Sequence, residues 1–512
     1  MIFTEWIELL SAPGLRNKAI LEQLFNPSEE TARGIELRFC HDSREARAGD
    51  IYIAFPGERV DGHDYVDEAF LAGARLAIVS EIRPYNGHCL YVEDTRRFVQ
   101  ELAARWWKTL NPKGIGITGS NGKTTTKEWV KDILNQFLPP ETVFFNPGNQ
   151  NTEIGLPLCI LNGLNRRHRW AVLEMGLAKP GDLSTLTAMF PLVCSVLLNV
   201  GSAHIGNFED FEGLFREKSE IIRTSAPGSS IVLYGNAPSI RALGSACPDR
   251  QVTYFGESLP DADGDRSVSL ESYRIDLRGE RPVTELKLKV LTRTITLSFP
   301  VFLHRGFVMD LCAALAVCST IIDTDRLIDF SPDLLTLPKD RFEIRSLRGN
   351  WMIFDHYNAS YESLCTALDL LVEMKRIRFI PHFHLVLGSV LETGRHSNEI
   401  HTRIAEKILS SDPLSVYLFS RESSILETQR AMERARDGRQ AASRIPITCF
   451  SSSDPEAIAK GIAHDLSVSH NHIFYFKASR MVRMEEVVES VMDLLDRGNH
   501  HNSDLQIQHS SI

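Results

Sequence analysis

Residues 114–128 read GIGITGSNGKTTTKE, and this stretch decides how the rest of the chain is interpreted. Its apolar beginning, residues 114–118, predicts a buried strand, and residues 125–137 predict a helix. Glycines in the intervening turn allow backbone N–H groups to close on an anion, which the helix N-terminus also attracts. The pattern therefore indicates a phosphate-binding loop, the alternative being a glycine turn that binds nothing.

The loop is a variant of the general P-loop. The general spacing places a glycine five residues before Gly122, where this chain has Ile117, so the loop has the form TGxxGKT. We expect Lys123 to reach the terminal phosphates of a nucleotide and the Thr124 hydroxyl to face Mg²⁺. The other loop residues expected at the nucleotide are Gly119, Ser120, Asn121, Gly122 and Thr125.

Length and composition restrict the class of protein. A chain of 512 residues is too long for one core, which predicts two to four domains. The net charge of −10, without a long basic run, argues against general nucleic-acid binding. The nine cysteines show no metal-binding spacing and indicate buried thiols in a reducing compartment. No apolar window is long enough to cross a membrane, so we expect a soluble, cytoplasmic protein.

Strand-like and helix-like segments alternate along the chain and predict an α/β protein of three domains. The expected boundaries are residues 1–110, 111–335 and 336–498, followed by a disordered tail at 499–512. Within the central region, residues 284–300 alternate as a β-hairpin does, and residues 258–270 predict a surface loop.

Two candidate metal ligands follow predicted strands of the central region. Glu174 ends the strand at 170–176, and His204 lies just beyond the strand at 193–200. Because ligands gather at the carboxyl ends of parallel strands, these side chains could hold metal beside the phosphate loop. A glutamate or a histidine also occurs at a strand end without binding a metal. Lys218 lies on a predicted helix, where composition alone favours a solvent-facing side chain.

The first region carries two candidate ligand-binding segments. Ser43 and Arg44 offer a hydroxyl and a guanidinium that suit a phosphate or a base edge. Residues 57–64 form a glycine-rich polar loop between two predicted strands, a common position for a binding loop. From this region alone, both segments could equally be solvated turns.

Taken in order, the motifs resemble the Mur ligase family over nearly the whole chain. The resemblance rests on HDSREARAGDIYIAFPGERVDGHDY (41–65), TGSNGKTT (118–125), NQNTEIGLP (149–157), EMG (174–176), AHIGNF (203–208), EKSEI (217–221), DHYNAS (355–360), LGSVLETG (387–394) and KASRMVRMEEVV (477–488). The last three are most similar to the branch that joins D-alanyl-D-alanine to UDP-N-acetylmuramoyl-tripeptide. The Asp-Asn-Pro-Arg motif of the tripeptide-forming branch does not occur.

The chain departs from the family pattern at three places. Residues 304–310, HRGFVMD, stand where the family has Arg-His-Asn-x-x-Asn, and the loss of both asparagines leaves adenine contact at this stretch open. Ser389 replaces an aspartate, and Ala478 replaces a glycine.

The resemblance implies an N-terminal α/β domain that binds the UDP substrate, a central P-loop-type ATP-binding domain with a mostly parallel sheet, and a C-terminal Rossmann-like domain. It implies an ATP-dependent ligase that forms an acyl phosphate in a cytoplasmic step of peptidoglycan precursor synthesis, as a monomer without nucleic-acid or membrane partners. The alternatives are another Mur-type amino-acid ligase, a polyglutamylating relative, or a nucleotide-dependent switch without ligase activity.

The resemblance also assigns site residues. It implies that Lys123, Glu174, His204 and Lys218 are catalytic, with Thr124 and Glu174 on one Mg²⁺, and with His204 and a carbamylated Lys218 on a second. Arg341 and Asp355 would meet the nucleotide from the third domain. The residues expected to bind the UDP substrate are Ser43, Arg44, Gly57, Asp61, Gly62, His63, Asn149 and Thr152.

Overall fold

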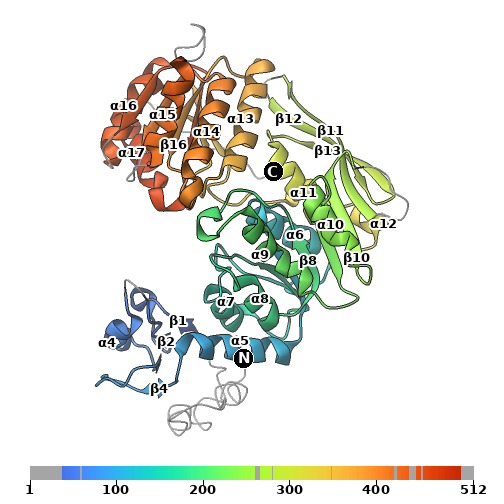
Figure 1. Ribbon diagram of the computed structural model, residues 1–512, viewed down its shortest axis with the longest axis vertical. Coiled ribbons are helices and arrows are strands. Elements are labelled where there is room, and N and C mark those ends of the chain that lie inside the picture. The colour runs from blue at the N-terminus through green and yellow to red at the C-terminus, as the bar shows by residue number, and fades with distance from the viewer. Residues whose placement is uncertain are drawn as a thin grey trace.

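The computed structural model describes residues 37–57, 60–259, 266–279, 281–347, 349–419, 424–437, 445–450 and 454–497. Over these residues the chain is α/β, with three sheets of mostly parallel strands that follow one another in sequence (Figure 1). The predicted tail at 499–512 lies outside the described residues. None of the described helices has the length and apolar character needed to span a membrane.

The N-terminal domain is built on a parallel sheet of four strands in sequence order, which are β1 (Phe39–Cys40), β2 (Ile51–Ile53), β3 (Leu76–Val79) and β4 (Cys89–Tyr91). The short helix α4 (Val66–Leu71) packs beside them. Two 3₁₀ turns, η1 (Ser43–Glu45) and η2 (Gly62–Tyr65), begin at Asp42 and Asp61, whose carboxylates accept backbone N–H bonds.

Helix α5 (Thr95–Leu110) joins this sheet to the central domain. The Asp94 carboxylate caps its N-terminus, and Asn111 ends it in the left-handed conformation with φ 48°. Its buried side includes Trp106, whose indole N–H donates to the Leu164 carbonyl just after α7 (Gly155–Gly163). In Figure 1, α5 runs beneath the central domain. The sheet of the N-terminal domain lies at the end of the central domain that is far from the C-terminal domain.

The central domain holds a nine-stranded sheet in the order β13-β12-β11-β10-β9-β8-β5-β7-β6. Its strands are β5 (Lys113–Thr118), β6 (Val143–Phe145), β7 (Trp170–Glu174), β8 (Leu192–Leu197), β9 (Ser230–Tyr234), β10 (Gln251–Glu257), β11 (Arg266–Arg278), β12 (Arg281–Val290) and β13 (Arg293–Phe299). Helix α6 (Lys123–Phe137) follows the phosphate loop, and α7 comes after it. The other helices of the domain are α8 (Asp182–Met189), α9 (Phe211–Arg223), α10 (Pro238–Ser245), α11 (Arg305–Cys318) and α12 (Thr324–Leu327). Strand β5 lies between β7 and β8, so the strand order proceeds from β5 toward both edges of the sheet. Parallel sheets bind ligands at such a switch point.

One prediction in this domain is confirmed and one is partly wrong. Strands β12 and β13 pair antiparallel, as the alternation at 284–300 predicted. The predicted surface loop at 258–270 is wrong from Arg266 onward, because β11 begins there and pairs with β10 and β12. Ser267 and Ser269 are typical of turns, but here they are buried in the sheet with Val268 and Leu270. Pairing on both sides overrides the weak strand preference of serine.

The C-terminal domain holds a six-stranded sheet in the order β14-β15-β19-β16-β17-β18. The strands are β14 (Glu343–Leu347), β15 (Asn350–Phe354), β16 (Phe383–Gly388), β17 (Ser415–Phe419), β18 (Ile447–Phe450) and β19 (Ile473–Lys477). Only the edge strand β14 pairs antiparallel. The helices are α13 (Tyr361–Arg376), α14 (Ser397–Ser411), α15 (Ser424–Asp437), α16 (Pro455–Val468) and α17 (Met484–Arg497). This arrangement confirms the predicted Rossmann-like character.

Candidate active site

A cleft of about 640 Å³ lies between the central and C-terminal domains. The central domain contributes the phosphate loop and the residues after β7 and β8, and the C-terminal domain contributes the segments that follow β15, β16 and β19. This volume suits a small-molecule ligand.

The phosphate loop is held in shape by its own contacts. Gly122 has φ 85°, and a Cβ there would lie 2.9 Å from the Asp310 Cγ atom and closer still to Oδ1, so any side chain would have to displace Asp310. The Asn121 N–H donates to Asn199 Oδ1 over 2.9 Å, and Asn199 Nδ2 donates back to the Asn121 carbonyl over 3.0 Å. The Lys123 amine folds over the loop and donates to the Gly119 carbonyl over 2.8 Å, so it lies where phosphates would meet it. Burial lowers the pKa of Lys123.

Glu174 is the centre of a buried polar network at the end of β7. Thr124 Oγ1 donates to its Oε2 over 2.8 Å, and Asn151 Nδ2 donates to its Oε1 over 2.7 Å. The fully buried Lys127 amine lies 3.9 Å from Oε2. Arg341, from the segment before β14, donates to Thr124 Oγ1 over 2.9 Å. A hydroxyl and a carboxylate beside a phosphate loop are the hard oxygen donors that Mg²⁺ prefers.

His204 and Lys218 occupy different surroundings. His204 lines the cleft, and its Nδ1 lies 2.6 Å from Glu392 Oε2 of the C-terminal domain. That hydrogen bond lowers the pKa of Glu392. Lys218 is only 1% exposed, so the expectation of a solvent-facing side chain is wrong. Burial first, and the Lys123 charge next, lower its pKa far below the usual range of an amine. The described residues that line the cleft do not include Lys218.

Arg341 and Asp355, which we expect to meet the nucleotide, both line the cleft from the C-terminal domain. Asp355 Oδ2 accepts hydrogen bonds from Lys477 Nζ over 2.6 Å and from the Tyr475 hydroxyl over 2.7 Å. The Arg341 guanidinium lies 4.3 Å from the ring centroid of Tyr357, a cation–π contact. These contacts fix both side chains at the edge of the cleft.

An aromatic wall, formed by Tyr234, Phe255, His304 and Phe307, lines another part of the cleft. The His304 and Phe307 rings stack with centroids 3.9 Å apart at 21°. Burial lowers the pKa of His304 to about 4, so its ring is neutral near pH 7. Such a wall suits a planar heterocycle. The sequence signalled this region only through the departures at 304–310.

The residues expected to bind the UDP substrate fall into two groups. Asn149 and Thr152 line the cleft, whereas Ser43, Arg44, Gly57, Asp61, Gly62 and His63 lie on loops of the first sheet. Arg44 pairs with Asp42 through two hydrogen bonds and keeps 85% of its side chain exposed. Ser43 Oγ donates to Glu68 Oε2 over 3.0 Å.

The glycine-rich loop of the first sheet is closely packed. A Cβ on Gly57 would lie 2.5 Å from the Val60 carbonyl oxygen, and one on Gly62 would lie 2.8 Å from the Phe55 nitrogen. His63 is buried, with Nδ1 2.7 Å from Asp61 Oδ1 and Nε2 accepting from the Ser80 N–H over 3.0 Å. Both ring nitrogens are therefore engaged in holding the loop, which does not leave His63 available to a ligand in this arrangement.

Across the described chain, Asp61, His63 and Glu81 form the one group of three residues whose ligand atoms lie close enough to hold a metal. Arg83 already forms ion pairs with both carboxylates, with N–O distances of 3.3 Å to Asp61 and 2.5 Å to Glu81. The guanidinium supplies the positive charge that a cation would bring, so this group carries no metal assignment.

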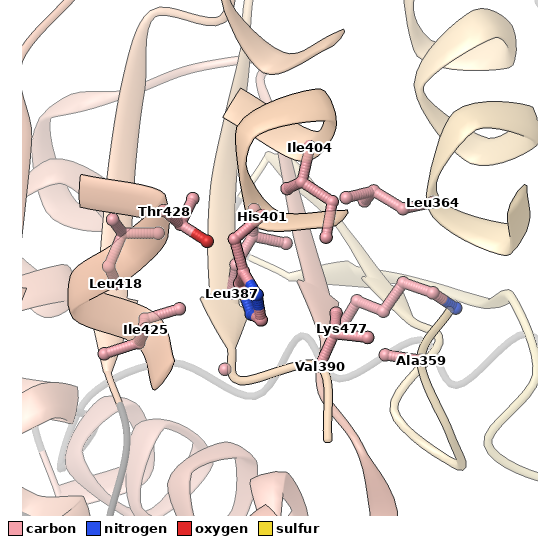
Figure 2. Close-up of a pocket in the computed structure, with 11 residues that line it drawn as sticks. Ala359, Leu364, Leu387, Val390, His401, Ile404, Leu418, Ile425, Thr428 and Lys477 are labelled. Atoms are coloured by element: carbon pink, nitrogen blue, oxygen red, sulfur yellow. The ribbon is translucent and has the colours of Figure 1, made fainter. Parts of the chain in front are cut away.

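A second, much smaller cavity of about 10 Å³ lies inside the C-terminal domain. Figure 2 shows the His401 ring among the apolar side chains that line it, with Lys477 along one edge. His401 is 1% exposed, and no described residue forms a hydrogen bond with its Nε2. A space of this size holds one water molecule at most, so the cavity cannot take a substrate.

Sequence reasoning missed several polar residues of the cleft. Asn151 and Glu392 lie inside motifs quoted above, so their positions in those motifs were a usable signal. Glu362 gave none, because a glutamate in the first turn of a helix is ordinary. Its carboxylate accepts from the Ser202 N–H and Oγ, each over 2.9 Å, and so joins the two domains.

Comparisons with known proteins show which family this chain is similar to. A model of the Mur ligase family catalytic domain matches residues 39–107, and a model of the Mur ligase middle domain matches residues 117–290. The UDP-N-acetylmuramoyl-tripeptide–D-alanyl-D-alanine ligase of Haemophilus influenzae is 26% identical over 88% of this chain and 93% of its own length. The corresponding ligase of Bacillus subtilis is 26% identical over 88% of this chain and 92% of its own length.

A solved structure extends the similarity to the whole fold. The MurF ligase of Thermotoga maritima, crystallised in complex with ADP, is 30% identical to this chain. The superposition covers 90% of this chain and 99% of that one, with a TM-score of 0.73. From its motifs, its fold and this similarity, the chain belongs to the Mur ligase family.

Proposed function

We propose that this chain is a MurF ligase. It joins D-alanyl-D-alanine to the terminal carboxylate of UDP-N-acetylmuramoyl-tripeptide with consumption of ATP, a step of peptidoglycan precursor synthesis. The observation that carries the proposal is the cleft, in which the phosphate loop and the Thr124–Glu174 pair face Arg341 and Asp355 from another domain. Full-length similarity to ligases of this name supports the choice of substrates.

The reaction begins with a carboxylate, which is a poor electrophile. Transfer of the γ-phosphoryl group of ATP to a carboxylate oxygen breaks the bond to the β-phosphate, releases ADP and gives an acyl phosphate. The amine of D-alanyl-D-alanine then attacks the acyl carbon, and phosphate leaves from the tetrahedral intermediate. Such chemistry depends on positioning and on neutralising negative charge. Lys123 and the loop N–H groups would hold the β and γ phosphates, with Gly119 to Thr125 as the nucleotide-binding segment.

Thr124 and Glu174 fit a Mg²⁺ site by their donor chemistry, and His204 with a carbamylated Lys218 would serve a second. Bound there, the metal would reduce the repulsion between carboxylate and phosphate as they approach. The low pKa of buried Lys218 favours the neutral amine that must react with CO₂ to form a carbamate. Arg341 and Asp355 would hold the nucleotide when the domains close.

The UDP end of the substrate would bind at the first sheet, through Ser43, Arg44 and the loop that contains Gly57, Asp61 and Gly62, while His63 holds that loop in shape. Asn149 and Thr152 would guide the peptide into the cleft. We propose residues 1–110, 111–335 and 336–498 as the domains that perform these tasks. The peptide must then run along the central domain from one end to the other, consistent with the separation of the two regions (Figure 1).

We place this activity in the cytoplasm. All nine cysteines are free thiols, and seven of them are buried, which fits a reducing compartment. We propose that the enzyme acts as a monomer, as the family resemblance implies.

An acceptor-dependence assay tests the proposal. Purified protein receives ATP, Mg²⁺ and UDP-N-acetylmuramoyl-tripeptide, and phosphate release is followed with D-alanyl-D-alanine, single amino acids or glutamate as acceptor. Release that requires D-alanyl-D-alanine supports the proposal. Release with another acceptor would indicate a different amino-acid ligase or a polyglutamylating relative, and hydrolysis independent of the UDP substrate would indicate a nucleotide-dependent switch.

A further inference from the structure

Glu392 contacts His204 across the domain boundary, and both residues have the left-handed backbone conformation. His204 has φ 67° and Glu392 has φ 61°, values that residues other than glycine rarely adopt. The Gly206 N–H donates to the Glu392 carbonyl over 2.8 Å. A Cβ on Gly206 would lie 2.6 Å from the Gly394 nitrogen, so the two turns fit closely. Strained conformations that persist at such a contact point to a functional role.

The contact defines the protonation pattern of the imidazole. Nδ1 lies 2.6 Å from a carboxylate oxygen, and because a carboxylate only accepts, Nδ1 must carry the hydrogen. In the neutral imidazole the lone pair is then on Nε2. A carboxylate that accepts from one ring nitrogen is the usual way in which a metal-binding histidine is oriented and kept in one tautomer.

We propose that Glu392 is a positioning residue that orients His204 as a ligand when the C-terminal domain closes, so that closure itself completes the second metal site. The inference rests on the proposed function and adds a residue to its site. The carboxylate comes from the C-terminal domain and the imidazole from the central domain, so the pair exists only when the two are together. Domain closure would thus complete the site from residues of both domains.

A simple latch between the domains does not explain the pair. Glu362 already joins them, through two hydrogen bonds to Ser202. Glu392, by contrast, directs its carboxylate to a ring nitrogen and keeps about half of its side chain exposed beside the cleft. Its contact therefore affects the imidazole directly.

The test is a double-mutant cycle on Glu392→Ala, His204→Ala and the double variant. Binding of Mn²⁺ is measured by electron paramagnetic resonance with a non-hydrolysable ATP analogue present, together with kcat and the Mn²⁺ requirement for turnover. We expect Glu392→Ala to weaken the second Mn²⁺ about tenfold and the first one little. The double variant should bind no more weakly than His204→Ala, since Glu392 acts through the imidazole.

Matched variants separate orientation from closure. Glu399→Ala removes an exposed carboxylate nearby on α14 and should leave Mn²⁺ binding unchanged. Glu392→Gln keeps an oxygen that can accept from Nδ1 and should recover most of the affinity. Circular dichroism and small-angle X-ray scattering verify folding and closure for each variant.

Two results would overturn the inference. One is wild-type affinity for the second Mn²⁺ in Glu392→Ala, and the other is additive losses from Glu392→Ala and His204→Ala. If the unaltered protein needs no D-alanyl-D-alanine for phosphate release, the proposed function fails instead, independently of these binding results.

Discussion

Replacement of Gly122 by alanine tests the geometry of the phosphate loop, because a second glycine provides a matched control. Gly122 and Gly181 each precede the first turn of a helix in the left-handed conformation, with φ 85° and 94°. A Cβ on Gly181 would meet nothing within 4 Å, whereas one on Gly122 would lie 2.9 Å from the Asp310 Cγ atom and closer to Oδ1.

The magnitudes follow from this difference. Both alanine variants lose about 1–2 kcal/mol from the left-handed backbone alone. Gly122→Ala must in addition displace Asp310 or the loop, because real Cβ atoms essentially never come within 3.0 Å of other atoms. Since a displacement of about 1 Å from productive geometry can cost about a hundredfold in rate, we expect kcat/KM for ATP to fall at least that much.

The assay measures phosphate release against ATP concentration for Gly122→Ala, Gly181→Ala and the double variant Gly122→Ala with Asp310→Ala. Gly181→Ala should lose stability but retain its turnover. The double variant should recover part of the lost ATP affinity, because removal of the Asp310 carboxyl makes room for the new methyl group. Normal ATP kinetics in Gly122→Ala, or an equal loss in Gly181→Ala, would refute the reasoning.

Four further predictions concern single side chains. Lys123→Ala should abolish ligation at saturating ATP, and near-normal turnover would remove the phosphate-loop assignment. Lys218→Ala should be nearly inactive and partly restored by a short-chain carboxylic acid; ¹³CO₂ should label the unaltered lysine, and retained activity in the variant would argue against a carbamate. Burial lowers the pKa of His304 and His384 to about 4, whereas imidazoles of the unfolded chain titrate near about 6.5, so the unfolded chain binds more protons between these pH values. The free energy of unfolding should therefore fall as pH is lowered from about 6.5 to about 4, and it should fall less steeply in His384→Gln. Chemical denaturation across this pH range measures the slope, and an equal slope in the variant would contradict the prediction. Arg44→Ala should raise KM for the UDP substrate alone, and an equal rise for ATP would count against a UDP site there.

Local sequence was sufficient for the elements that carry the phosphate loop. The apolar run, the glycines and the helix-forming residues after them predicted β5 and α6, because each depends on neighbours in sequence. Glu174 could be placed for a similar reason, since strand ends gather on one edge of a parallel sheet.

The burial of Lys218 follows from a signal within its own helix. Leu214, Lys218, Ile221 and Ile222 recur at helical spacing, and all four are buried on one side of α9. Hydrophobic periodicity therefore predicts the buried face for Lys218, whereas the general preference of lysine for solvent predicts the opposite face.

The contacts between domains could not be predicted from local pattern. Glu392 and His204 lie far apart in sequence and meet only because two domains pack together, as do Glu362 and Ser202. No periodicity or motif spacing encodes such a meeting. The aromatic wall is a similar case, since its members come from β9, β10, α11 and the residue that caps α11.

The central claim is that the chain activates a carboxylate by phosphoryl transfer. The direct measurement uses UDP-N-acetylmuramoyl-tripeptide labelled with ¹⁸O in its terminal carboxylate, together with ATP and D-alanyl-D-alanine, and analyses the released phosphate by mass spectrometry. In an acyl phosphate, the bridging oxygen comes from the carboxylate and leaves with phosphorus when the amine attacks carbon. The account predicts one ¹⁸O in each phosphate released and amide product in equal amount, whereas unlabelled phosphate would contradict it.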